Sequence, residues 1–320
     1  MDRQSAVAGL RTALADFAAN WLVDAQSWCV ALSGGPDSLA LTIAAAATRP
    51  TTALIVDHGL QSDSEVVALA AQQQAMDLGC VGARVLRVQV GDAGGPEAAA
   101  RTARYAALDA ARQGAPVLLG HTLDDQAETV LLGLGRGSGA RSIAGMRPCD
   151  PPWYRPLLGM RRGVTHAACA ELGLAVWDDP HNSDPRFTRV RLRTEVLPLL
   201  EQVLGGGVAE ALARTASALR EDTDALDSLA GQDLVGAVSG DGLEVAAIRD
   251  LPAALRRRVI RAWLLAGGAS GLTDTQIRAV DALVDAWRGQ GGVAVGSEVP
   301  YTRLFAERRG AALKLSRKPV

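Results

Sequence analysis

The amino-acid sequence predicts an α/β fold with a doubly wound parallel sheet, followed by a second, mostly helical C-terminal domain. Two observations carry this prediction. Short apolar runs alternate with segments of helical periodicity, strictly as far as Gly120 and less regularly beyond it, an order that is typical of βαβ units with helices on both faces of a sheet. Near Leu200 this alternation stops and the pattern becomes mostly helical. We therefore predict one domain over residues 1–205 and a second over residues 206–320, with the boundary at the run Gly205–Gly207.

The elements of the first domain follow from its hydrophobic periodicity. Apolar positions at helical spacing predict helices over residues 3–25, 39–47, 64–78, 96–112 and 121–134. Short apolar runs predict buried strands at residues 27–32, 51–56, 83–90 and 116–120. In such sheets ligands bind at the carboxyl ends of the strands. The segment Ser33–Ser38, His58 and His121 are therefore candidates for a ligand site.

The rest of the chain is less regular. A glycine-rich turn over residues 133–139 precedes a strand, a helix and an arginine-rich stretch within residues 153–200. Beyond them, helices are expected at residues 212–229, 255–265 and 275–287, and two short strands at residues 293–295 and 311–315.

Composition excludes several classes of protein. An apolar fraction of 48% and a charged fraction of 21% belong to a folded chain rather than a disordered one. Charged residues interrupt the N-terminal segment and no run of about 18 apolar residues occurs, so we expect no signal peptide and no membrane partner. The four cysteines are widely spaced and form no C-x-x-C pair, which gives no sign of a zinc ribbon or an iron–sulfur cluster. A cytoplasmic protein is predicted.

Charge is distributed unevenly along the chain. The net charge is −2, but residues 251–320 hold 12 Lys and Arg against 5 Asp and Glu, a local balance of +7. A basic C-terminal part is typical of a surface that meets phosphate, although a solvated charged face would give the same balance. The two lysines of the sequence are Lys314 and Lys318, so no Walker A lysine exists and any nucleotide must be held in another way.

One polar loop follows the first predicted strand. Its residues are Ser33, Gly34, Gly35, Pro36, Asp37 and Ser38. The glycines permit a tight turn whose N–H groups, with a helix N-terminus behind them, can hold phosphate. The serine hydroxyls can donate hydrogen bonds to phosphate, and Asp37 can ligate a divalent metal ion. The same residue types favour an ordinary capped turn, so the residues by themselves leave both interpretations open.

A second polar segment, Gly120–Thr129, begins at the end of the fourth predicted strand. Asp124 and Glu128 are four residues apart and therefore share one face of the predicted helix. Such carboxylates can simply cap the helix N-terminus. If they face the loop Ser33–Ser38, called the phosphate loop below, a cluster that includes Asp125 can instead bind Mg²⁺ or the ammonium group of a lysine.

These segments carry a family resemblance. The pattern S-G-G-x-D-S resembles the motif of the PP-loop, or N-type, ATP pyrophosphatases, which split ATP between its α and β phosphates. Three further stretches resemble tRNA(Ile)-lysidine synthetases: V-D-H-G-L at residues 56–60, E-x-x-x-R-x-x-R-Y at residues 97–105 and G-H-x-x-D-D-Q-x-E-T at residues 120–129. Shorter matches are R-P-L-L at residues 155–158, D-P-x-N at residues 179–182 and the arginine-rich residues 187–198. The resemblance covers residues 27–200 well and is thinner from Leu251 onward.

The resemblance implies an ATP- and Mg²⁺-dependent enzyme that joins free L-lysine to C2 of the wobble cytidine of tRNA(Ile) with a CAU anticodon. The residues to which it gives catalytic roles are Asp37, His121 and Asp125, with Asp37 and Asp125 also near the metal ion. It implies that ATP is bound by the loop Ser33–Ser38 together with Asp57 and His58. The carboxylates that it implies for lysine are Asp124 and Glu128. The arginines that it implies for tRNA or phosphate are Arg101, Arg104, Arg136, Arg189 and Arg193.

Two alternatives stay open at this point. One is a tRNA thiolase on the same fold, against which the lack of a cysteine pair counts. The other is a non-catalytic nucleotide-binding protein, which would not need a basic second domain. The sequence departs from the family pattern at Leu123, where the family usually has alanine, and it stops where longer relatives add another C-terminal domain. The oligomeric state stays open, with a homodimer as one option.

Overall fold

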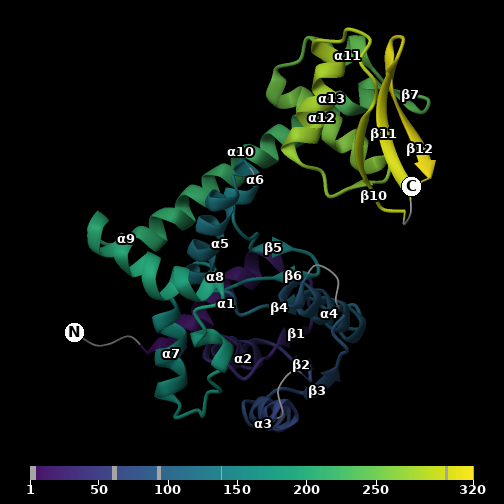
Figure 1. Ribbon diagram of the computed structural model, residues 1–320. Coiled ribbons are helices and arrows are strands. Elements are labelled where there is room, and N and C mark those ends of the chain that lie inside the picture. The colour runs from purple at the N-terminus through teal and green to yellow at the C-terminus, as the bar shows by residue number, and fades with distance from the viewer. Residues whose placement is uncertain (1–4, 60–62, 92–94, 138, 300–301, 320) are drawn as a thin grey trace. The chain divides into compact units, whose positions relative to one another are not determined.

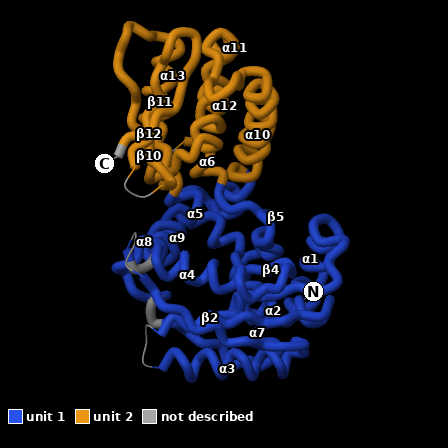
Figure 2. Tube along the Cα trace, turned by 90° about the vertical axis from the view of Figure 1, so that its right-hand side faces the viewer, with its two compact units in different colours: residues 1–132, 145–214 blue, residues 133–144, 215–320 orange. Residues whose placement is uncertain are grey.

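The computed structural model describes residues 5–59, 63–91, 95–137, 139–299 and 302–319. The start of the first predicted helix, at residue 3, and Leu60 of the V-D-H-G-L stretch lie outside these residues. The chain forms two compact units, coloured separately in Figure 2. Unit 1 comprises Met1–Leu132 and Gly145–Arg214, and unit 2 comprises Gly133–Ala144 and Thr215–Val320.

Unit 1 is built on a six-stranded sheet with the order β3-β2-β1-β4-β6-β5 (Figure 1). The strands are β1 Trp28–Ala31, β2 Thr51–Asp57, β3 Gly82–Arg87, β4 Val117–Leu118, β5 Cys149–Asp150 and β6 Trp153–Tyr154. All neighbours pair in parallel except β5 and β6, which are antiparallel. The parallel sheet predicted from the alternation of strands and helices is confirmed.

Helices cover both faces of this sheet. They include α1 Ala6–Trp21, α2 Pro36–Thr48, α3 Ser64–Asp77, α4 Pro96–Ala111, α5 Leu123–Arg136 and α7 Arg162–Glu171. Alternate residues of β1 enter different cores, as the two-residue period of a strand requires. Trp28 and Val30 pack with residues of α1, α2, α3 and α7, whereas Cys29 packs with Leu108 of α4. The sheet is therefore doubly wound.

The strand order reverses direction beside β1. From β1 the chain moves to β2 and β3 on one side and then returns to β4 on the other. Cys29 and Val30 pair with Val117 and Leu118 of β4, so the two strands end beside each other. Ligands bind at such a switch point because the loops after the two strands diverge there. The loop Ser33–Ser38 and the segment that begins at Gly120 are those loops.

Unit 2 combines helices with a second six-stranded sheet, of order β7-β8-β12-β11-β10-β9. Its helices are α6 Ala140–Ile143, the continuation of α10 Val208–Ala237, α11 Val245–Arg249, α12 Ala253–Ala266 and α13 Asp274–Asp285. Its strands are β7 Val238–Ser239, β8 Gly242–Glu244, β9 Ala269–Ser270, β10 Val293–Ser297, β11 Thr302–Arg309 and β12 Ala312–Pro319. This antiparallel sheet is larger than the two strands predicted. In β11, Leu304 and Ala306 are buried at alternate positions, but the charged residues around them hide that period in the sequence.

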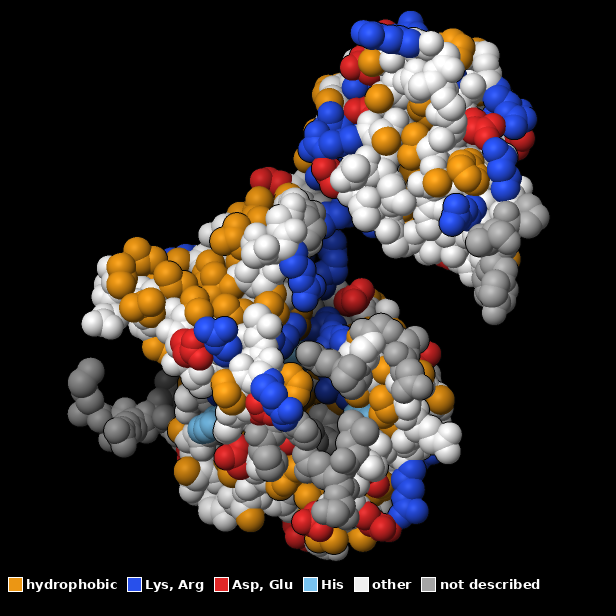
Figure 3. Space-filling model, in the orientation of Figure 1, with side chains coloured by type: hydrophobic (Ala, Val, Ile, Leu, Met, Phe, Trp, Pro, Cys, Tyr) orange, Lys and Arg blue, Asp and Glu red, His pale blue; other side chains and the backbone are white. Residues whose placement is uncertain are grey.

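The end of unit 1 exposes apolar side chains. After a 3₁₀ turn at Pro180–Ser183, the chain forms α8 Thr188–Arg191, a π-helical turn Leu192–Val196 and α9 Leu197–Leu204. Hydrophobic side chains gather over α9 (Figure 3), where Leu199, Val203 and Leu204 are exposed. In the described part of the chain, no single helix has the length and apolar character to cross a membrane; the bent pair Thr188–Leu204 and Val208–Ala237 meets those two criteria only when taken together.

Candidate active site

The loop Ser33–Ser38 forms a closed turn between β1 and α2. Gly34 has a φ of +82°, in the left-handed region that favours glycine, and its carbonyl accepts a hydrogen bond from the N–H of Trp177 at 3.0 Å. The Ser38 hydroxyl accepts from the Ser33 N–H at 3.1 Å and donates to the Gly35 carbonyl at 2.9 Å. Gly35 is the N-cap of α2 and supplies no capping side chain. The N–H groups of the first turn of α2 are therefore not capped by that residue, which is the geometry of an anion site.

Gly120 brings the end of β4 against the first turn of α2. A Cβ atom at Gly120 would lie 3.0 Å from the carbonyl oxygen of Asp37 and 3.1 Å from the nitrogen of Ser38. Only a residue without a side chain fits such an approach between two backbones. The segment after β4 consequently starts beside the phosphate loop.

The acidic helix α5 places three carboxylates on its first two turns. Asp125 accepts hydrogen bonds from the N–H and the hydroxyl of Thr122, both at 2.8 Å. Burial alone would raise the pKa of Asp125, but the charge of Arg162 and the hydrogen bonds from Thr122 lower it, so this carboxylate is ionised. The side chain of Glu128 is fully buried, and that of Asp124 is 20% exposed.

Arg162, at the start of α7, joins these carboxylates to the phosphate loop. Its Nη2 lies 2.6 Å from Oδ1 of Asp125, and its Nε lies 3.3 Å from Oδ2 of Asp37. Its Nη1 is 3.4 Å from Oε1 of Glu128, and its backbone N–H donates to Oδ2 of Asp124 at 2.7 Å. Arg162 was not among the site residues predicted from the sequence. Its position in the sequence could have indicated it, because Arg162 follows the R-P-L-L match to the family by four residues.

Arg193 and Arg189, predicted as contacts to tRNA or phosphate, both reach α5. In the π-helical turn, Nε of Arg193 lies 2.8 Å from Oε1 of Glu128 and its Nη2 lies 3.7 Å from Oδ1 of Asp125. Arg189 donates from Nη1 to the Thr129 hydroxyl at 3.5 Å. Glu128 is thus a buried carboxylate that two arginines share.

Asp37 is held by α7 on both carboxylate oxygens. Arg162 contacts Oδ2, and the hydroxyl of Thr165 donates to Oδ1. Burial raises the pKa of Asp37, and the charge of Asp125 raises it further, while Thr165, Arg162 and His166 oppose that change. Because the charge of Asp125 acts on Asp37 and Arg162 contacts both, the two predicted metal-binding carboxylates belong to one electrostatic cluster.

The two histidines after strand ends are held neutral. Burial lowers the pKa of His121 to about 3, with Arg155, Arg104 and Arg101 adding to the effect and Asp125 opposing it. Burial also lowers the pKa of His58, and the charge of Arg104 adds to that. Each can therefore offer a hydrogen bond but not a charge at neutral pH.

Three other predicted residues lie on α4 and at the end of β2. The guanidinium carbons of Arg101 and Arg104 lie 4.9 and 5.4 Å from the ring centre of Tyr105. Asp57 is buried and its Oδ1 accepts from the N–H of Gly59 at 2.9 Å. The structure thus gives these arginines a cation–π partner and leaves their charge without a carboxylate partner in any described contact.

Arg136 is not part of this cluster. It is exposed at the last turn of α5, eleven residues after Asp125, which corresponds to about 16 Å along a helix. It belongs to the segment of α5 that is grouped with unit 2.

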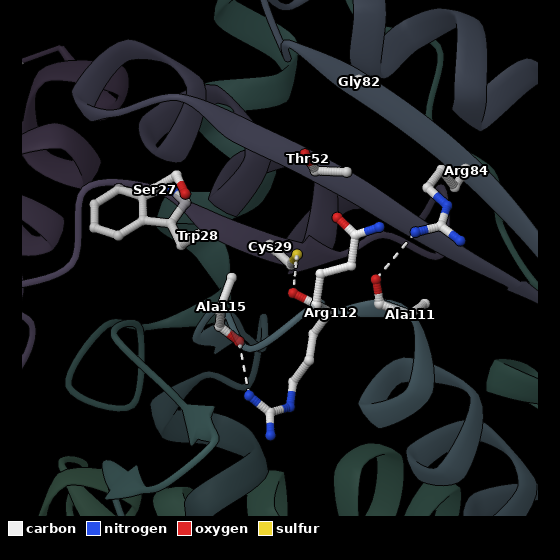
Figure 4. Close-up of a pocket in the computed structure, with 10 residues that line it drawn as sticks. Ser27, Trp28, Cys29, Thr52, Gly82, Arg84, Ala111, Arg112 and Ala115 are labelled. Atoms are coloured by element: carbon white, nitrogen blue, oxygen red, sulfur yellow. Dashed lines mark hydrogen bonds between the residues drawn. The ribbon is translucent and has the colours of Figure 1, made fainter.

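A cavity of about 420 Å³ lies at the opposite edge of the sheet, at the amino-terminal ends of the strands (Figure 4). The arginines that line it are Arg84 and Arg112. Arg84 donates to the carbonyl of Ala111 at 3.1 Å, and Arg112 donates to the carbonyl of Ala115 at 3.3 Å. These side chains satisfy one carbonyl group at the end of α4 and one just after it, so their position has a structural explanation. The cavity contains none of the predicted site residues.

No group of three or more His, Cys, Asp or Glu side chains is arranged to hold a metal ion within the residues that the structure describes. The four cysteines are free thiols, and burial raises the pKa of Cys80 and of Cys169 to about 11. Among the described residues, Asp37 and Asp125 are the two carboxylates predicted for a metal ion at the phosphate loop.

Known proteins resemble the chain over its full length. A family model described as the PP-loop domain matches residues 8–200, and one described as the TilS substrate binding domain matches residues 243–308. The tRNA(Ile)-lysidine synthase of Mycolicibacterium paratuberculosis is 70% identical over 320 residues, which are 100% of both chains. The protein of that name from Nocardia farcinica is 62% identical and covers 93% of this chain and 96% of its own. Among solved structures, the U34-tRNA thiolase NcsA from Methanococcus maripaludis aligns with a TM-score of 0.55 over 68% of this chain and 81% of its own. At 16% identity, that likeness concerns the fold alone.

Proposed function

Because this chain belongs to the tRNA(Ile)-lysidine synthase family, we propose that it uses ATP to join free L-lysine to C2 of the wobble cytidine of tRNA(Ile) with a CAU anticodon. The cytidine O2 attacks the α-phosphate of ATP and pyrophosphate leaves. The ε-amine of lysine, in its neutral form, then attacks C2, loses a proton, and AMP departs with the oxygen. The reaction takes place on the cytoplasmic tRNA pool.

The phosphate loop is the proposed ATP site. N–H groups at the start of α2 and the hydroxyls of Ser33 and Ser38 would bind the pyrophosphate part of ATP, as Gly34, Gly35 and Pro36 shape the turn. Asp57 ends the neighbouring strand, His58 follows it, and both would complete the site. Neutral His121 lies beside Asp125 and would contribute a hydrogen bond near the reacting groups.

Mg²⁺ fits this arrangement. The ion is usually bound by one or two carboxylates with substrate phosphates and water as its other ligands, and Asp37 and Asp125 offer two carboxylates next to the phosphate loop. When bound, the ion would supply charge neutralisation for the phosphates. Arg162 already neutralises part of the charge of both carboxylates.

Lysine and tRNA are assigned by charge. Asp124 and Glu128 are the proposed carboxylates for the lysine substrate; Asp124 is partly exposed, whereas Glu128 is buried and would exchange an arginine partner for the ammonium group. Residues 206–320 are the proposed tRNA-binding domain, because the balance of +7 over their last part, residues 251–320, suits a phosphate backbone. The arginines proposed to contact tRNA or ATP phosphate are Arg101, Arg104, Arg136, Arg189 and Arg193.

The convergence of Asp37 with the α5 carboxylates beside an uncapped helix N-terminus carries this proposal. The test measures pyrophosphate release from ATP with purified protein, bulk tRNA and each of the twenty amino acids supplied singly. We expect tRNA-dependent release, with lysine alone becoming attached to tRNA. Asp37→Ala should abolish release, and Asp16→Ala, which changes an exposed aspartate of α1, should not. Release without lysine attachment would reject the ligase assignment, and undiminished release from Asp37→Ala would reject the site.

A further inference from the structure

The guanidinium group of Arg162 meets carboxylates from two separate sequence motifs. Asp37 belongs to the first turn of α2, and Asp125 and Glu128 belong to α5. The distances are 3.3 Å to Asp37, 2.6 Å to Asp125 and 3.4 Å to Glu128, and the Arg162 side chain is 16% exposed. One planar group therefore spans the gap between the phosphate loop and the acidic helix.

The residue preferences of a helix N-terminus do not explain why an arginine stands at position 162. Arg162 is the first residue of α7 and Arg161 is its N-cap, at the helix end where the dipole favours anions. The side chain of Arg161 makes no capping hydrogen bond to the helix. Instead Asp124 of α5 accepts the Arg162 N–H at 2.7 Å. Asp124 of α5 thus caps the N-terminus of α7, and the guanidinium group of Arg162 in α7 balances the charge of carboxylates on α5. These contacts fix the position of the two helices against each other.

Asp37 is fixed from both sides by the same turn of α7. The Thr165 hydroxyl lies within hydrogen-bond distance of Oδ1 of Asp37 and is 2.7 Å from the carbonyl oxygen of Arg162. Nε of Arg162 lies on the other oxygen, Oδ2. Rotation of the Asp37 carboxylate would break one of the two contacts.

We propose that Arg162 is a positioning residue for adenylation, which sets the distance of Asp37 from Asp125 and Glu128 and thereby aligns ATP with the attacking oxygen. This inference rests on the proposed function and assigns Arg162 no contact with substrate. It requires the rigid fork of arginine, because three carboxylates lie in different directions and a lysine ammonium is a single point of charge.

The test is steady-state pyrophosphate release by the full chain, with ATP, tRNA and lysine each varied. We expect Arg162→Ala to lower kcat by about 100-fold, the effect of misplacing reacting groups by about 1 Å, with the KM for ATP changed less than about threefold. Arg162→Lys should lose about tenfold, because it restores the charge without the fork. Added guanidinium ion should raise the kcat of Arg162→Ala by at least about tenfold, and an equal concentration of sodium chloride should not raise it. Arg87→Ala, which changes a 70% exposed arginine, is the matched control.

The outcomes separate the two proposals. If the unchanged protein releases no pyrophosphate, the proposed function fails. If it does, and Arg162→Ala or Arg162→Lys keeps a kcat within about threefold of it, only the role of Arg162 is overturned. A loss without guanidinium rescue and with a matching rise in the KM for ATP also overturns it. If Arg162→Ala does not fold, the test rests on Arg162→Lys. A kcat of Arg162→Lys equal to that of the unchanged protein would then overturn the role of Arg162.

Discussion

Replacing Gly120 by alanine tests how closely β4 and α2 must approach. The added Cβ would lie 3.0 Å from the carbonyl oxygen of Asp37, whereas ordinary contacts of a Cβ begin at 3.4 Å. The first turn of α2 would therefore move by about 0.4 Å, the difference between these distances. The opposing atoms are backbone, so no side chain can rotate away to relieve the contact.

The expected size of the effect follows from that displacement. If a misplacement of 1 Å costs about 100-fold in rate and the logarithm of the rate falls linearly with distance, 0.4 Å corresponds to about a sixfold loss of kcat. Overpacking of this kind costs about 1 kcal/mol of unfolding free energy, at the low end of its range. For a unit of this size that corresponds to about 2–4 °C in Tm.

The assay combines tRNA-dependent pyrophosphate release with thermal unfolding. Gly159→Ala is the control, since a Cβ there would meet no heavy atom within 4 Å. We expect Gly120→Ala to lose activity and Tm by the amounts given, and Gly159→Ala to retain both. If the two variants have the same kcat and the same Tm, the close approach of β4 and α2 does not control the position of Asp37 and the reasoning is refuted.

Three further predictions concern single side chains. Burial lowers the pKa of His121 to about 3, so only the unfolded chain binds a proton there between about pH 3 and 6.5; the unfolding free energy should rise with pH in that window by about 1.4 kcal/mol per unit. His121→Asn should flatten that slope in urea titrations at about pH 5 and 6.5, and an unchanged slope would contradict it. Nε of Arg256 lies 2.5 Å from Oδ1 of Asp281 and both side chains are nearly buried; because Arg257 also contacts Asp281, at 2.9 Å, Arg256→Leu should cost unit 2 about 3 kcal/mol, the low end for a broken buried pair. Calorimetry should show that adding Asp281→Leu restores part of the lost unfolding free energy, and no such recovery would count against a buried-charge effect. Because burial raises the pKa of Cys80 and Cys169 to about 11, iodoacetamide at about pH 7.5 should label neither in the folded protein, and mass spectrometry that finds either labelled would disprove this.

The parallel sheet and the segments of its site could be predicted because their signals are local. Apolar runs such as Thr51–Val56 gave strands that the structure contains, and the polar residues that follow them lie where such sheets bind ligands. The Gly34 turn is also local, since glycine in a strand-to-helix segment has few other uses. The family resemblance then indicated which reaction these segments serve.

Contacts between distant segments could not be predicted in the same way. Arg162 meets Asp37 across 125 residues of sequence, and neither neighbourhood indicates the other. Arg193 was expected to face tRNA or ATP, and it pairs with Glu128, because a helix pattern gives the spacing of side chains but not the helix against which they pack. Strand β11 was missed for a related reason: its partners β10 and β12 identify it, while its own sequence is rich in charge.

The cations that accompany the α5 carboxylates are Arg161, Arg162 and Arg193. Both lysines of the sequence belong to β12 in unit 2. A guanidinium group keeps its proton at any physiological pH and is a poor nucleophile, whereas a lysine side chain that loses its proton attacks activated carbon readily. Arginine therefore balances the negative charge of these carboxylates without placing beside them an amine that could compete with the amine of the amino-acid substrate.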